Sequence, residues 1–180
     1  MVEAPAVQAA LIEAARAGDE AAFERLTRTR TDAMYRLSVA ITADEADAAD
    51  ALQESLIAAW RHLPGLREAD RFEAWLARIV VNSCRMTLRA RSRRRVREIP
   101  IEQLASAAAP RPDADSELLR RALRRLPAER REILALHYFE DRPVAELAEI
   151  LSIPVGTAKS RLFHARAALQ KALTEEEESR

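Results

Sequence analysis

The 180-residue chain has little of what disulfides, metal sites and β-sheets require. Its single cysteine, Cys84, excludes an internal disulfide and gives no support to a thiolate metal site. The three histidines, His62, His137 and His164, are far apart in the sequence and lack the spacing of metal ligands. Only three glycines and an aromatic content of 4% favour helices over sheets. We therefore expect an all-α fold without a metal ion or other cofactor.

Two further absences narrow the class of protein. No apolar run is long enough to span a bilayer, and the N-terminus has neither the charged start nor the apolar core of a signal peptide. The sequence also shows no carboxylate pair, no nucleophile with a neighbouring base and no phosphate-binding glycine loop. These observations predict a cytoplasmic protein that is not inserted in the membrane and has no catalytic residues.

Charge is balanced overall but separated along the chain. The formal net charge is zero, which would be unusual for a protein that simply coats nucleic acid. Carboxylates cluster between Asp44 and Glu54 and again between Glu175 and Glu178, whereas Arg85 to Arg97 is densely basic. Any one of these clusters is compatible with a solvated surface, so its meaning depends on the element that carries it.

Apolar spacing predicts an N-terminal helical domain over residues 1–91. We expect helices from Leu11 to Ala17, from an Asp19 cap to about Ile41, from a cap at Thr42 to Asp44 to about His62, and from near Asp70 onward. The inward residues of the third helix are predicted to be Ala49, Leu52, Leu56, Ala59, Trp60 and Leu63. Those of the fourth are predicted to be Phe72, Trp75, Leu76, Ile79, Ser83 and Met86.

A linker and a second helical domain follow. Helical periodicity is lost between residues 92 and 115, where prolines and an alanine run replace the basic cluster, so we predict a linker with extended or disordered character. The second domain covers residues 116–173, with helices from Ser116 to about Leu126 and from Pro127 to about Phe139, and residues 174–180 form an acidic tail. The predicted fold is thus two small all-α domains joined by a flexible linker.

The end of the second domain has the pattern of a helix-turn-helix. Apolar residues recur at helical spacing on both sides of residues 152–154: Val144, Leu147, Ala148 and Leu151, then Val155, Ala158, Leu162, Ala165 and Leu169. This arrangement turns the following residues outward or to the flanks: Gly156, Thr157, Lys159, Ser160, Arg161, Phe163 and His164. Such a face suits a DNA major groove and its phosphates. The alternative is a plain helical hairpin with a solvated face.

The fourth predicted helix carries a basic face that a simple bundle does not need. Its members are separated by seven, four, three and four positions, which places them in one longitudinal stripe: Arg71, Arg78, Asn82, Arg85 and Arg89. We call these five residues the arginine stripe and expect it to follow a phosphate backbone. Trp75 lies beside the stripe and is either a stacking platform for an unpaired base or a half-buried packing residue.

The third predicted helix carries an acidic face. Asp47, Asp50, Glu54 and Ile57 are expected to point outward. An apolar residue among exposed carboxylates suggests a protein partner with a basic surface. The alternative is a solvated helix flank that carries one isoleucine, which is common.

Together these segments resemble the extracytoplasmic-function sigma factors. Residues Asp47–Arg61 and Phe72–Asn82 are similar to the family's region two, and Leu126–Arg131 together with Gly156–Leu162 are similar to its region four. Two independent motifs in the family's order cover nearly the whole chain outside the linker and tails. Ser152 stands at a common glycine position of the family, where a left-handed conformation is often required.

The resemblance implies a non-enzymatic, nucleoid-associated protein that binds core RNA polymerase and promoter DNA, both double-stranded and melted, with an anti-sigma factor as a further partner. It places Asp50, Gln53 and Glu54 at the polymerase, with Asp47 and Ile57 on the same face. The arginine stripe and Trp75 fall at the minus-ten element, where Asn82 and residues 66–71 form a pocket for a flipped base. The resemblance also implies that six residues of the helix-turn-helix bind the minus-thirty-five element: Thr157, Lys159, Ser160, Arg161, Phe163 and His164.

Two other functions stay open at this point. A sigma-like decoy would keep the fold but bind an anti-sigma protein in place of DNA, and it would need neither the basic residues nor the DNA-reading residues. A conventional regulator would use only the C-terminal motif at an operator, which would leave the acidic face and the arginine stripe without a role.

Overall fold

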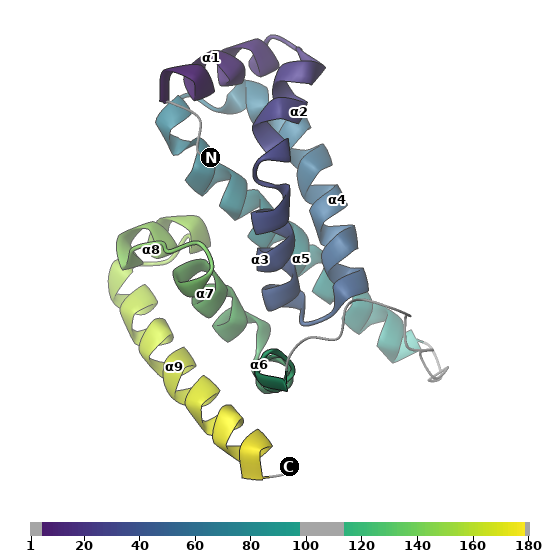
Figure 1. Ribbon diagram of the computed structural model, residues 1–180, viewed down its shortest axis with the longest axis vertical. Coiled ribbons are helices and arrows are strands. Elements are labelled where there is room, and N and C mark those ends of the chain that lie inside the picture. The colour runs from purple at the N-terminus through teal and green to yellow at the C-terminus, as the bar shows by residue number, and fades with distance from the viewer. Residues whose placement is uncertain (1–4, 98–113, 179–180) are drawn as a thin grey trace.

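The computed structural model describes residues 5–97 and 114–178, which contain helices and no β-strand (Figure 1). The N-terminal domain comprises α1 (Pro5–Arg16), α2 (Glu20–Arg28), α3 (Thr31–Thr42), α4 (Glu45–His62), the 3-10 turns η1 (Leu63–Gly65) and η2 (Ala69–Arg71), and α5 (Phe72–Arg97). The C-terminal domain comprises α6 (Ala114–Arg125), α7 (Ala128–Tyr138), α8 (Val144–Leu151) and α9 (Val155–Glu178). The predicted all-α class is confirmed for these residues. None of their helices is both long enough and apolar enough to cross a lipid bilayer.

Capping residues fix where two of the N-terminal helices begin. The Asp19 carboxylate accepts the backbone N–H of Ala22 at the start of α2, and the Asp44 carboxylate accepts those of Ala46 and Asp47 at the start of α4. Each distance is 3.0 Å. Both predicted caps are therefore confirmed.

The single helix predicted from residue 19 to about residue 41 is wrong, because α2 and α3 are separate helices. The break falls at Thr29 and Arg30, in a threonine-rich stretch. The Thr27 hydroxyl donates to a backbone carbonyl one turn earlier at 3.0 Å, and the Arg30 guanidinium donates to the carbonyl of Leu26. In the last turn of α2, the Arg30 guanidinium satisfies the carbonyl of Leu26 and the Thr31 hydroxyl satisfies that of Thr27 at 3.0 Å, which allows the helix to end there.

Helices α3, α4 and α5 pack side by side and form the core of the N-terminal domain (Figure 1). The buried face of α4 consists of small residues, which let its neighbours approach closely: Ala48, Ala51, Ser55 and Ala59. Ala49, predicted to point inward, is exposed because the buried face is centred one position earlier.

The buried face of α5 also differs from the prediction at one end. Met86 was expected to point inward, but its side chain is 69% exposed. The core stripe passes through Cys84, which is fully buried, and continues one turn later to Leu88, so Met86 lies off this face. Burial raises the pKa of the Cys84 thiol to about 12, which keeps it protonated.

The C-terminal domain contains the predicted helix-turn-helix in α8 and α9. Ser152 ends α8 in the left-handed conformation, with φ of 56°, and the N–H of Ile153 donates to the carbonyl of Ala148 at 2.9 Å. Ser152 thus adopts the left-handed conformation that the family's common glycine would provide at this position. Buried Leu162 anchors α9 as predicted, whereas Val155, also expected to point inward, is 45% exposed at the first position of α9.

Helix α9 runs through most of the predicted acidic tail and ends at Glu178. The Glu176 carboxylate lies 3.2 Å from Arg121 and 3.1 Å from Arg125, both on α6. Part of the tail is therefore an ion-paired end of α9 that packs against α6.

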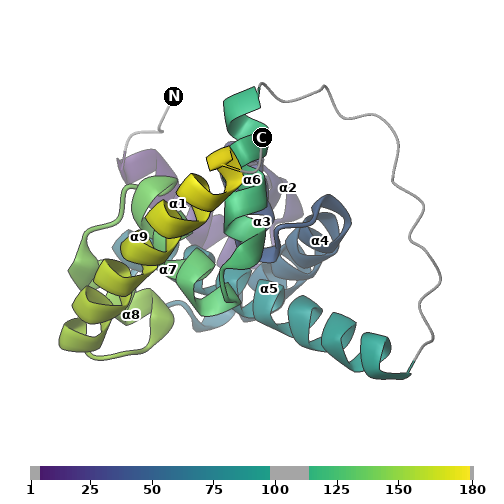
Figure 2. The ribbon, with the colours of Figure 1, turned by 90° about the horizontal axis from the view of Figure 1, so that it is seen from below.

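The two domains contact each other through α3, α5, α7 and α8 (Figure 2). Helix α7 packs on α3 and α8 packs on α5, and buried residues of both domains belong to one continuous hydrophobic cluster. Helix α5 continues through Arg97, so residues 92–97 of the predicted linker are helical, whereas residues 98–113 lie outside the described part of the chain. The sequence pattern contained no indication of this contact between the domains.

Candidate nucleic-acid and protein interfaces

The first half of α9 presents an exposed polar face. The exposed residues are Thr157, Lys159, Ser160, Phe163 and His164, with the Phe163 side chain 69% exposed. Arg161 is half-buried, and its guanidinium lies 3.9 Å from the Glu129 carboxylate on α7. Buried Ala158 and Leu162 hold the other side of α9 against α7 and α8. The fold therefore gathers all six predicted minus-thirty-five residues on the first half of α9 and leaves five of them open to solvent.

The arginine stripe on α5 is different, because much of it contacts the C-terminal domain. The Arg85 guanidinium forms two parallel hydrogen bonds with the carboxylate of Glu132 on α7, from Nε at 2.9 Å and from Nη2 at 2.7 Å. Glu132 is 1% exposed, and its hydrogen bonds raise the pKa of Arg85 above the usual value. Arg71 is ion-paired with the Glu149 carboxylate on α8, and Arg78 donates to the main-chain carbonyl oxygen of Glu149.

The remaining members of the stripe are open to solvent. Asn82 and Arg89 are exposed, and the Asn82 side-chain oxygen lies 3.5 Å from the Arg85 guanidinium. The arginine stripe is therefore split, with its first part and Arg85 engaged by the other domain and the rest accessible.

A cavity of about 520 Å³ lies beside the stripe. One wall comes from the loop before α5 and from the start of α5, and the other from α8; the lining includes Leu66, Glu68, Trp75, Glu149 and Ile150. Trp75 is half-buried, with its ring centre 5.7 Å from that of Phe72. The loop predicted to shape a base pocket thus does border a cavity, and α8 forms part of its wall.

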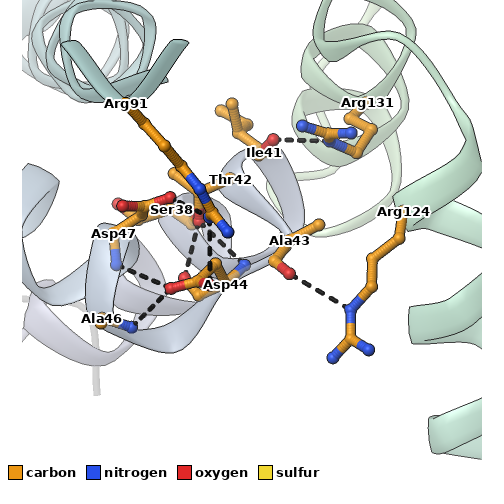
Figure 3. A network of polar contacts seen from close by, with 10 residues as sticks. All are labelled: Ser38, Ile41, Thr42, Ala43, Asp44, Ala46, Asp47, Arg91, Arg124 and Arg131. Carbon is orange, nitrogen blue, oxygen red and sulfur yellow. Dashed lines mark hydrogen bonds and ion pairs between the residues drawn. The ribbon is translucent and has the colours of Figure 1, made fainter. Parts of the chain in front are cut away.

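The acidic face of α4 is mostly free. Asp50, Gln53 and Glu54 are exposed, and Ile57 is 37% exposed. Asp47 is half-buried and ion-paired with Arg91 on α5 (Figure 3). Four of the five predicted polymerase-binding residues therefore share an accessible face, and Asp47 lies at its edge.

Arg91 also bonds the Asp44 carboxylate, at 3.0 Å, and so joins the start of α4 to α5 (Figure 3). Burial raises the pKa of Asp44, but the N–H of Asp47 and the positive charge of Arg91 outweigh it, so the pKa of Asp44 lies below its usual value. This ion pair belongs wholly to the N-terminal domain.

Sequence reasoning missed the residues that join the two domains. Arg131 on α7 is 8% exposed and donates to the carbonyl of Ile41, in the last turn of α3, at 2.6 Å (Figure 3). Arg124 on α6 donates to the carbonyl of Ala43 at 3.3 Å. Positive groups at a helix C-terminus satisfy its unpaired carbonyls and complement its dipole. The burial that permits this contact lowers the pKa of Arg131. No local signal separates Arg131 from its exposed neighbour Arg130, because the difference arises only in the tertiary contact.

The fold and these surfaces define a class: an all-helical protein with a helix-turn-helix in one domain and an arginine-lined helix in the other. Two family models match the chain, "Sigma-70 region 2" over residues 22–94 and "Sigma-70, region 4" over residues 116–169. The chain is 33% identical over 166 residues to the ECF RNA polymerase sigma factor SigM of Mycobacterium tuberculosis, covering 92% of this chain and 84% of SigM. It is 32% identical over 177 residues to the RNA polymerase sigma-H factor of Pseudomonas aeruginosa, covering 91% and 92%.

A solved structure agrees with these relatives. The sigma factor RpoE of Bartonella quintana, solved in complex with the anti-sigma factor NepR, superposes with a TM-score of 0.72 at 26% identity and covers 84% of this chain and 96% of that chain. The chain therefore belongs to the extracytoplasmic-function sigma factors of RNA polymerase.

Proposed function

We propose that this sigma factor binds core RNA polymerase, directs it to selected promoters and helps to melt them, with no catalytic step of its own. The observation that carries the proposal is the presence of distinct surfaces on the matched segments. Region two carries an exposed acidic face on α4 and the arginine stripe on α5, and region four carries the exposed polar face of α9. Such a protein acts in the cytoplasm, at the nucleoid.

The acidic face of α4 is proposed to bind the polymerase. Asp50, Gln53 and Glu54 supply charge and hydrogen-bond acceptors around Ile57, which is a suitable apolar centre for a docked helix. Asp47 is proposed to contact the polymerase from the rim of this acidic face, where its pairing with Arg91 orients its carboxylate. Rim charges of this kind steer association and fix the register of the docked partner.

The two DNA elements are assigned to different domains. The arginine stripe is proposed to hold the phosphates of the minus-ten element, with Asn82 and Trp75 at the unpaired bases. On α9, Lys159 and Arg161 are assigned to minus-thirty-five phosphates. The base edges of the same element are assigned to the remaining members of the face: Thr157, Ser160, Phe163 and His164.

Reconstituted transcription tests this function. Core polymerase with this protein should make transcripts from a cognate promoter, whereas core polymerase alone and the protein alone should make none. Sequencing transcripts from a genomic library identifies the promoters. A folded protein that supports no transcription anywhere in the library would rule the function out, and the decoy alternative would then gain support.

A paired substitution tests the stripe separately. Arg78→Ala with Arg85→Ala should slow promoter opening, because phosphate contacts are lost, and should leave polymerase binding nearly intact. Arg28→Ala is the matched control, since Arg28 is an exposed arginine on α2 outside the stripe. Equal loss of opening and of polymerase binding in the double variant would show that the stripe is not a DNA surface.

An anti-sigma factor is proposed as a further partner. The B. quintana relative was solved with such a factor bound, and this chain covers nearly all of that chain. Pull-down from the native cell with the full chain as bait should recover a dedicated binding protein that blocks transcription by the holoenzyme. Recovery of core polymerase alone would remove this partner from the proposal.

A further inference from the structure

An exposed arginine, Arg166, follows directly after the six residues of α9 that are assigned to the minus-thirty-five element, and it is not one of them. We infer that Arg166 is a further phosphate-binding residue for the promoter duplex, and that the neutral imidazole of His137 on α7 positions it. The inference rests on the proposed function, because it presumes that the polar face of α9 binds DNA.

Arg166 continues one flank of that face. Lys159, Phe163 and Arg166 are separated by four and three positions, so they lie in one longitudinal row on α9. All three are exposed, whereas Leu162 and Ala165 of the same turns are buried in the core. Lys159 is already assigned to a phosphate. A second cation two turns further along the same row can therefore contact another phosphate of the same duplex.

Two residues at the end of α7 hold the Arg166 guanidinium. Its Nη2 atom lies 2.8 Å from Nε2 of His137, and its central carbon lies 5.5 Å from the ring centre of Tyr138. The second distance is within the range of a cation–π interaction. His137 is half-buried, whereas Tyr138 is exposed. The guanidinium is thus fixed in position while it stays at the surface.

The turn between α7 and α8 determines which ring nitrogen of His137 carries the hydrogen. Nδ1 lies 3.1 Å from the carbonyl oxygen of Arg142, and because a carbonyl only accepts, Nδ1 is the donor. Nε2 is then unprotonated and accepts from Arg166. Asp141 has a φ of 50°, and the N–H of Arg142 donates to the carbonyl of Leu136 at 3.3 Å. The backbone of the turn therefore holds the imidazole in the tautomer that Arg166 requires.

The contacts of Arg166 leave its positive charge uncompensated. His137 is a neutral acceptor and Tyr138 is an aromatic ring, and no carboxylate among residues 5–97 and 114–178 is ion-paired with Arg166. Arg161, by contrast, lies 3.9 Å from the Glu129 carboxylate. His137 accepts from one N–H of the guanidinium, which has further donors for a phosphate oxygen. A cation that is already held in place loses little freedom when it binds, so its contact with a phosphate is stronger.

Duplex affinity of full-length variants tests the role of Arg166. The probe is a fluorescein-labelled duplex of mixed sequence, and binding is followed by fluorescence anisotropy at several salt concentrations. Arg166→Ala should weaken binding about three- to tenfold at low salt and reduce the slope of log affinity against log salt by about 1. Arg28→Ala removes the same charge from an exposed position on α2 and should change neither quantity. Circular dichroism checks that each variant is folded.

A matched pair of amides tests the positioning by His137. His137→Asn keeps a donor for the Arg142 carbonyl but lacks the reach to Arg166, whereas His137→Gln places an acceptor near the position of Nε2. If the guanidinium without its acceptor is in position in about one molecule in three, His137→Asn weakens binding about threefold with an unchanged salt slope. His137→Gln should stay within about twofold of wild type. Added to Arg166→Ala, His137→Asn should have no further effect, because it acts only through the guanidinium.

Lys159→Ala separates this inference from the function on which it rests. A loss of duplex affinity in Lys159→Ala, with affinity and salt slope unchanged in Arg166→Ala, would overturn the inference and leave the polar face of α9 as a DNA surface. No loss in either variant, or no duplex binding by wild type at low salt, would overturn the face and the inference together. Losses that add in the variant with both Arg166→Ala and His137→Asn would show that His137 supports the fold in general and does not position Arg166.

Discussion

The two candidate DNA surfaces use similar side chains, but one is mostly exposed and the other is partly bonded to the neighbouring domain. On α9 the proposed minus-thirty-five residues are exposed, with Lys159 fully accessible and Arg161 near a carboxylate only at 3.9 Å. On α5 the proposed minus-ten residues are partly engaged, with Arg85 bonded twice to a buried carboxylate. The two helices proposed to bind DNA therefore differ in which of their residues contact the other domain.

The difference lies in the contacts that each face makes. The reading face of α9 is mostly exposed in the described chain, whereas Arg71, Arg78 and Arg85 of the arginine stripe are bonded to α7 or α8. Four predictions test the contrast.

The largest expected effect is a difference in the free energy of unfolding between alanine variants of two phenylalanines, one on α5 and one on α9. Phe72 begins α5 and is 0% exposed, whereas Phe163 on α9 is 69% exposed. Phe72→Ala should lower the free energy of unfolding by about 3–5 kcal/mol because it leaves a cavity in the core. Phe163→Ala should change it by less than about 0.5 kcal/mol. Urea unfolding followed by circular dichroism measures both, and a large loss in Phe163→Ala would show that the α9 face is packed.

The second prediction concerns the anchor between the domains. Arg131→Ala should cost about 1–3 kcal/mol, because it leaves two buried carbonyls without their charged donor. Arg130→Ala, at the exposed neighbouring position, should cost less than about 0.5 kcal/mol. Equal stability of the two variants would show that the buried hydrogen bonds contribute nothing.

Much of the fold could be predicted from local patterns. The caps at Asp19 and Asp44, the helix-turn-helix and the left-handed Ser152 each depend on residues within one turn of each other, where spacing and side-chain chemistry decide the outcome. The break at Thr29 was missed because apolar periodicity runs through it while threonine hydroxyls compete for the backbone. Met86 was misplaced because a spacing of three or four does not fix the helix face over several turns.

The sequence could predict which residues form the candidate site, but not which of them are bonded to the other domain. Periodicity placed Arg71, Arg78 and Arg85 in one stripe. In the structure Arg71 ends η2 and the other two lie on α5, and all three contact the C-terminal domain. The partner of Arg85 is Glu132, 47 positions away, and no local pattern relates the two. Pairing across domains depends on how two finished domains pack, so it became visible only in the three-dimensional structure.

The third prediction uses the chain's two lysines, both on α9. Lys159 lies on the exposed reading face, whereas Lys171 lies far along the helix, 3.8 Å from the Glu175 carboxylate. Lys159→Ala should weaken binding of free protein to a mixed-sequence duplex a few-fold and reduce the slope of log affinity against log salt by about 1. Lys171→Ala should leave both unchanged. A similar loss in the two variants would show that binding reflects overall charge and not the reading face.

The smallest expected effect concerns the ion pair between Arg91 and Asp44. This pair lies within one domain, whereas Arg85 pairs with Glu132 of the other domain. The pKa of Asp44 is lower in the folded chain than its usual value. Its charge therefore stabilises the fold above the unfolded pKa, and this contribution is lost as pH falls through the folded pKa. Asp44→Asn keeps a side chain that can cap α4 but removes the charge beside Arg91. The variant should be less stable than wild type by under about 1 kcal/mol at neutral pH, since the pair is partly screened, and the difference should vanish once the pH is below the folded pKa of Asp44. Urea unfolding across this pH range measures the change. Single-strand affinity should stay at the wild-type value, because this ion pair lies outside the arginine stripe. An increase in affinity would show that the stripe responds to general loosening of α5.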